Sequence, residues 1–67
     1  MFVIYHVCFL PERSAMPVFW SATLEGAKAI AEREELNLAN FLANGPADEI
    51  AGLENSLIEI LFEPLPR

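Results

Sequence analysis

The chain has 67 residues, one cysteine and a net charge of -6, from ten acidic residues against four basic ones. So short a chain has room for one domain and one core, and Cys8 alone cannot form an intramolecular disulfide. Scarce Lys and Arg disfavour direct nucleic-acid binding, and His6 and Cys8 are too few for a structural zinc site. We expect a single domain over residues 1–67, cytoplasmic and reduced, without metal or cofactor.

The first ten residues, MFVIYHVCFL, carry no charge. We expect neither a secretory signal, which starts with basic residues, nor a membrane helix, which needs about 20 apolar residues. The β-branched and aromatic composition favours a strand. Alternation places Phe2, Ile4, His6, Cys8 and Leu10 on one face and Val3, Tyr5, Val7 and Phe9 on the other. Two largely apolar faces predict a central strand.

The segment from Pro11 to Pro17 is typical of a hairpin loop. Strand character resumes in VFWSA, residues 18–22, where Val18 and Trp20 face one way and Phe19 the other. Two strands joined by a short polar loop are expected to pair antiparallel.

A helix is predicted next, in TLEGAKAIAERE. Thr23 suits the N-cap, and Glu25 lies in the first turn, where the helix dipole favours a negative charge. The helical period places Leu24, Ala27, Ile30 and Ala31 on one face.

The helical register is expected to break near residues 33–36, because it would otherwise place Glu34 at the centre of the apolar face. Asn37 can cap a new short helix, which Asn44 and Gly45 would end in the left-handed conformation that they tolerate. Pro46 can then open one or two further helical turns.

The last predicted strand is SLIEILFE. Its faces are Ile58, Ile60 and Phe62 on one side, and Leu57, Glu59, Leu61 and Glu63 on the other. The mixed second face suits an edge strand. Residues 64–67, PLPR, are predicted to be a short Pro-rich tail.

These elements predict an α+β fold in β-β-α-α-β order. The simplest packing is a three-stranded, mainly antiparallel sheet with the first strand central and the helices on one face. The last strand could pair with the first strand or with the second. The opposite face of the sheet would carry uncovered apolar side chains, which a second copy of the chain or another protein could cover.

Two candidate sites of different chemistry can be drawn from the sequence. His6 and Cys8 lie two residues apart on one strand, the spacing at which an imidazole could activate a thiolate. At mid-strand positions a core histidine and a small buried thiol are the commoner outcome, and we expect no enzyme. The other candidate is a partner-binding surface, formed by carboxylates of the helix and by large aromatic residues of the strands. Its residues are Glu25, Glu32, Glu35, Trp20 and Tyr5.

The stretch SATLEGAKAIAERE, which follows a hairpin, resembles small phage-encoded anti-CRISPR proteins of the type I-F group over about residues 2–35. The matching positions are a Ser or Thr helix start, a Leu, and Ala27, Lys28, Ile30 and Ala31. The resemblance implies an inhibitor that occupies a CRISPR surveillance complex and keeps target DNA from being bound or cleaved.

The predicted function is therefore that of a small acidic, non-enzymatic protein that inhibits a nucleic-acid-handling host defence complex by direct docking. Its partner would be a protein, such as a CRISPR surveillance complex or nuclease, and neither nucleic acid nor a membrane. The alternative is a structural or regulatory homodimer that uses the uncovered sheet face and inhibits nothing.

Overall fold

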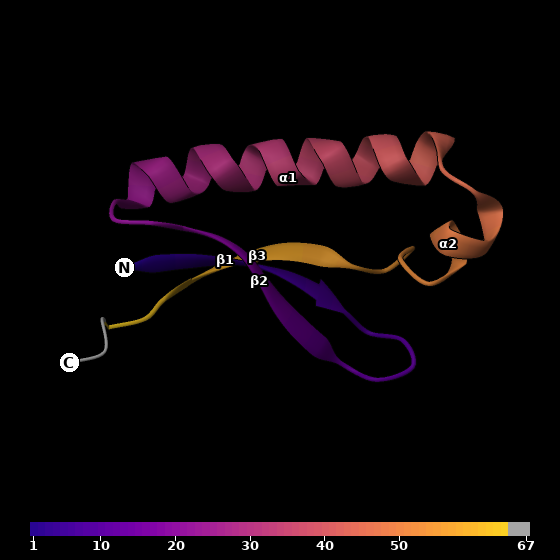
Figure 1. Ribbon diagram of the computed structural model, residues 1–67, viewed down its shortest axis with the longest axis horizontal. Coiled ribbons are helices and arrows are strands. Elements are labelled where there is room, and N and C mark those ends of the chain that lie inside the picture. The colour runs from indigo at the N-terminus through magenta and orange to yellow at the C-terminus, as the bar shows by residue number, and fades with distance from the viewer. Residues whose placement is uncertain (65–67) are drawn as a thin grey trace.

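The computed structural model describes residues 1–64. The elements are β1 (Phe2–Cys8), β2 (Ser14–Ser21), α1 (Leu24–Asn44), α2 (Ala47–Ala51) and β3 (Leu57–Phe62). The strands form one antiparallel sheet in the order β2-β1-β3, and α1 runs along one side of it (Figure 1). The predicted α+β fold with a central first strand is confirmed, and β3 pairs with β1. Beyond Pro64, the predicted Pro-rich tail lies outside the described residues.

The core lies between β1 and the first half of α1. Ile4 and Ala27 are fully buried and Ala31 is nearly so, and partly buried side chains from all three strands and α1 pack around them: Phe2, Val18, Ile30, Ile58 and Ile60. Because alanine has a short side chain, the helix backbone can approach β1 closely at these two positions.

β2 begins earlier than predicted, at Ser14, so the loop that joins it to β1 is shorter than the segment from Pro11 to Pro17. The pairing of β1 with β2 is also irregular. Ile4 pairs with Phe19 and the next residue, Tyr5, pairs with Pro17, so Val18 is an extra residue in β2. Such a bulge bends and twists a strand locally.

The predicted break near residues 33–36 is wrong, because α1 is one continuous helix of 21 residues. Its start is as predicted: the hydroxyl of Thr23 accepts a hydrogen bond from the backbone N–H of Gly26 at 3.1 Å. The helix is about 31 Å long, whereas the seven residues of β1 span about 23 Å. The buried residues of α1, Ala27 and Ala31, both lie in its first half, and Glu34 stays in register but only half-buried.

The predicted left-handed end at Asn44 and Gly45 is also wrong, since none of residues 1–64 has a positive φ. The backbone N–H of Gly45 donates to the carbonyl oxygen of Phe41 at 2.7 Å. A Cβ at Gly45 would lie 2.6 Å from that oxygen. Glycine is therefore favoured at position 45, because it has no Cβ to clash with the carbonyl oxygen of Phe41. Pro46 precedes α2 as its N-cap.

Candidate protein-binding surface

The sheet face turned away from α1 is called the outer face here. Val3, Tyr5 and Val7 of β1 alternate with the core residue Ile4 and so lie on the outer face. The strand register gives each of them a neighbour on both sides. These neighbours are Ala15, Pro17 and Trp20 on β2 and Leu57, Glu59 and Leu61 on β3.

The outer face is apolar and partly open to solvent. Val3 is buried between Trp20 and Leu61, but Trp20 itself is 65% exposed and Leu61 is 44% exposed. The ribbon shows no helix on this side of the sheet (Figure 1). The uncovered apolar sheet face expected from the alternation of the sequence is thus present in residues 1–64.

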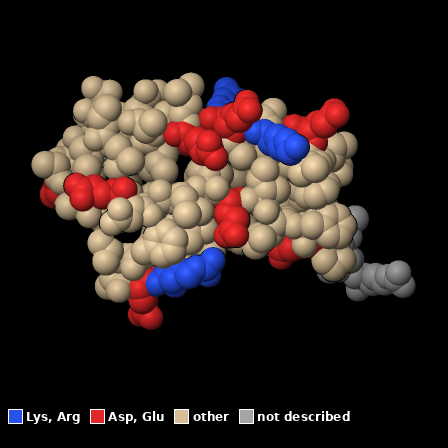
Figure 2. Space-filling model, turned by 180° about the vertical axis from the view of Figure 1, so that it is seen from behind, with Lys and Arg blue, Asp and Glu red and all other residues tan. Residues whose placement is uncertain are grey.

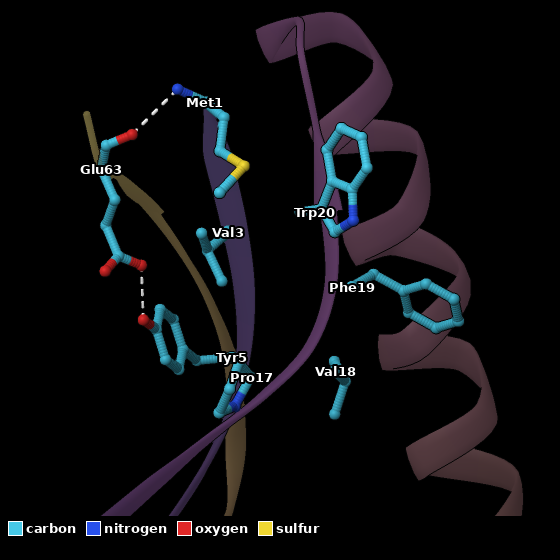
Figure 3. A pocket seen from close by; sticks show the side chains of 8 residues that line it. All are labelled: Met1, Val3, Tyr5, Pro17, Val18, Phe19, Trp20 and Glu63. Carbon is cyan, nitrogen blue, oxygen red and sulfur yellow. Dashed lines mark hydrogen bonds between the residues drawn. The ribbon is translucent and has the colours of Figure 1, made fainter. Parts of the chain in front are cut away.

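A shallow hollow of about 360 Å³ lies on the outer face. Figure 3 shows Trp20 and Phe19 of β2 on one side of it, and Met1, Val3 and Tyr5 on the other. Glu63, just after β3, completes its rim. The hollow therefore combines a mostly apolar lining with one carboxylate, a composition typical of a recognition surface.

Glu63 accepts two hydrogen bonds at the polar side of this hollow. The N-terminal amino group of Met1 donates to the backbone carbonyl of Glu63 at 2.9 Å, and the hydroxyl of Tyr5 donates to the carboxylate of Glu63 (Figure 3). The hydrogen bond to Glu63, with smaller contributions from burial and from the negative charge of the carboxylate, raises the pKa of Tyr5 above 10.0. These contacts fix the phenol ring at the edge of the hollow.

The structure separates the five predicted partner-binding residues into two groups. Trp20 and Tyr5 both line the hollow of the outer face. Glu25, Glu32 and Glu35 are exposed residues of α1, in the other layer of the fold. Sequence reasoning did not single out Met1, Leu61 and Glu63, although the alternation of the last strand had already placed Leu61 and Glu63 together on one face.

Charged side chains do not form a continuous acidic surface in the view of Figure 2. Acidic groups lie in separate places there, and basic side chains lie next to those at the top, where α1 runs. Arg13, in the loop between β1 and β2, and Glu59 of β3 form an exposed ion pair at 3.7 Å. Exposed pairs of this kind contribute little to stability. The positive charge of Arg13 partly compensates the negative charge of Glu59.

His6 and Cys8 are close together on the helix-facing side of β1. The Sγ atom of Cys8 is 4.0 Å from Nε2 of His6, and both residues are half-buried. His6 also lines a hollow of about 320 Å³ between the sheet and the second half of α1, together with Glu34 and Asn37. Among residues 1–64, no three His, Cys, Asp or Glu side chains are grouped so that they could hold a metal ion.

Comparisons with known proteins identify no relative: no protein-family model, no curated protein and no solved structure matches this chain. Within residues 1–64, no helix combines the length and the apolar character needed to cross a membrane.

Proposed function

We propose that this protein acts by binding another protein through the outer face of its sheet, without catalysis. The observation that carries the proposal is that Trp20 is 65% exposed. Trp20 lies beside the buried Val3 and lines an apolar hollow. Covering such a surface removes apolar area from water and so favours association. Tryptophan is among the residues that contribute most to binding when they lie at the centre of an interface.

In this proposal the bound protein belongs to a nucleic-acid-handling host defence complex, which the chain inhibits by direct docking. Two features support that target class. Residues 2–35 resemble type I-F anti-CRISPR proteins, and the net charge of -6 favours approach to the basic surface of a nucleic-acid-binding protein. A CRISPR surveillance complex or its nuclease is therefore the partner to test first.

The experiment compares the wild-type protein with Trp20→Ala and Leu36→Ala. Leu36 is a matched control, because it is also a large apolar residue, is 62% exposed, and lies on α1. Each protein is used to capture partners from cells that carry a type I-F CRISPR system, and its affinity for the recovered complex is then measured. We expect Trp20→Ala to weaken binding roughly 30-fold, as for a central interface residue, and Leu36→Ala to leave the affinity within about twofold of wild type.

Two outcomes would contradict different parts of the proposal. If no nuclease or surveillance subunit is captured, the inhibitor role is wrong. If Trp20→Ala and Leu36→Ala bind the captured complex equally well, the outer face is not the docking surface. Circular dichroism of each variant shows whether the fold is intact, so that a loss of binding is not mistaken for unfolding.

A further inference from the structure

β3 is an edge strand. Its hydrogen bonds with β1 show which backbone groups of β3 have no partner within the sheet. Met1 and Glu63 exchange two backbone hydrogen bonds, at 2.8 and 2.9 Å. Hydrogen-bonded pairs alternate along an antiparallel ladder, so Leu61, Glu59 and Leu57 also point their backbone groups toward β1. The backbone N–H and C=O groups of Ile58, Ile60 and Phe62 therefore point away from the sheet.

The two edges of the sheet differ in how well they are protected from further pairing. β2 contains Pro17, which has no N–H, and the bulge at Val18, two devices that block edge-to-edge association. β3 has neither, and it contains no Lys or Arg. Three of its six residues are large, exposed and apolar: Leu57, Leu61 and Phe62. β3 is thus the edge that can accept another strand.

A groove runs beside this edge, between β3 and the second half of α1. Its volume is about 270 Å³. The lining is mainly apolar and comes from both elements: Glu35, Leu38, Ala39 and Leu42 of α1, with Ser56, Leu57 and Ile58. A strand added to β3 would place its helix-facing side chains along this groove, as in peptide recognition by strand addition.

We propose that the occupant of this edge is β3 of a second copy of the chain, paired antiparallel about a two-fold axis at Ile60. In this register Ile60 pairs with the partner's Ile60, and Ile58 pairs with the partner's Phe62. Each copy then donates three backbone hydrogen bonds and accepts three, through the residues whose groups point away from β1. The two three-stranded sheets become one continuous sheet.

Repulsion between carboxylates favours this register over the two registers that are shifted by two residues. With Ile60 on the axis, Glu59 lies opposite the partner's Leu61. A shift of two residues in one direction would place Glu59 opposite the partner's Glu59, and in the other direction opposite the partner's Glu63. Like charges directly opposite each other destabilise a strand pair, so both shifted registers are disfavoured.

The same register gives the exposed Phe62 a place to pack. Phe62 is 66% exposed, and its ring forms an edge-to-face pair with the ring of Phe2, with ring centres 5.1 Å apart. Opposite the partner's Ile58, which lines the groove, the ring of Phe62 would be covered on its open side. The contact is made twice in the dimer because of the two-fold symmetry.

This inference does not rest on the proposed function. The dimer uses the edge and the groove beside it, and it leaves Trp20 and the hollow of the outer face uncovered. Loss of the dimer and loss of target binding are therefore separate results.

A crosslinking experiment tests the register directly. Glu59→Cys and Leu61→Cys are made separately in a Cys8→Ser background, which removes the native thiol. Positions 59 and 61 of different copies form a non-hydrogen-bonded pair, with Cα atoms about 4.5 Å apart, within the range that a disulfide spans. We expect mild oxidation of the mixture to give a covalent dimer that contains one copy of each variant. Either variant alone should give little, because equal positions lie roughly 7–8 Å apart, on a diagonal.

A charge series tests the same contact without crosslinking. By sedimentation, we expect Leu61→Glu to weaken the dimer roughly tenfold, since it places two carboxylates opposite each other at two positions. Leu61→Lys should strengthen it several-fold by facing the partner's Glu59. Combining Leu61→Glu with Glu59→Lys should restore the dimer.

Three results would overturn the proposal. One is a wild-type protein that sediments as a monomer at high micromolar concentration. Another is crosslinking of Glu59→Cys with itself in preference to the mixture, which would indicate a shifted register. The third is equal weakening by Leu61→Glu and Leu61→Lys, which would mean that Leu61 contributes only apolar area to an interface of another kind.

Discussion

At the scale of single residues, Tyr5 joins the central strand to the end of the chain. Its hydroxyl donates to the carboxylate of Glu63, 58 positions away in sequence, while its ring lines the hollow of the outer face. Alternation places Tyr5 on this face, but only the pairing of β1 with β3 brings Glu63 within reach of it. The hydrogen bond is therefore a product of sheet topology.

This contact predicts an unusual titration for Tyr5. The neutral phenol donates to a carboxylate, so ionisation would break the hydrogen bond and place two negative charges together, which raises the pKa above 10.0. Because the pKa is raised in the folded state, the stabilising contribution is fully present below about pH 10 and is lost as the pH rises through the folded-state pKa.

Tyr5 is the only tyrosine in the chain, so ultraviolet absorbance of tyrosinate measures this pKa without interference from another phenol. We expect Glu63→Gln to move the titration back toward 10.0, because the carboxylate that accepts the hydrogen bond is removed together with its charge. Identical titration curves for wild-type protein and Glu63→Gln would show that the hydrogen bond does not form in solution.

At the scale of elements, α1 depends on its first turn and its first half. Thr23 caps it, and Ala27 and Ala31 hold it against the sheet. Glu34 occupies the next position of the same stripe and is half-buried, next to the hollow that His6 lines. A carboxylate can lie in this stripe because the hollow is open there and water can reach it.

We expect Thr23→Ala to lower the free energy of unfolding by about 1 kcal/mol, the usual cost of removing an N-cap side chain. The hydroxyl of Thr23 accepts from the backbone N–H of Gly26, and in Thr23→Ala this donor would have no such partner. Urea unfolding measures the change. Thr23→Ser keeps the hydroxyl and is the matched control, so equal losses in both variants would contradict a capping role.

At the scale of the whole molecule, two layers cannot cover both faces of a sheet whose central strand is apolar on both sides. α1 covers the face that contains Ile4, and the face that contains Trp20 and Leu61 is left partly exposed. The acidic residues that the sequence suggested for partner binding lie on α1. The predicted carboxylates and the exposed apolar sheet face therefore lie in different layers of the molecule.

This separation predicts different effects for changes in the two layers. Changing both Glu25 and Glu32 to Lys moves the net charge from -6 to -2, since each substitution removes one negative charge and adds one positive charge. If the outer face docks on the target, we expect the affinity to stay within about threefold of wild type, with the change mainly in the association rate. A much larger loss, in a variant whose circular dichroism is unchanged, would move the interface to α1.

Local patterns in the sequence determined the three strands, the α+β class, the central position of β1, the cap at Thr23 and the presence of an uncovered apolar face. Alternation, composition and capping are properties of neighbouring residues, so they can be read without a structure. Only the tertiary structure decided that α1 continues through Glu34 and that Gly45 ends it without a left-handed residue. It also decided that Trp20 is exposed. These outcomes depend on how the elements pack against one another and on which residues stay accessible to water. No local sequence pattern contains that information.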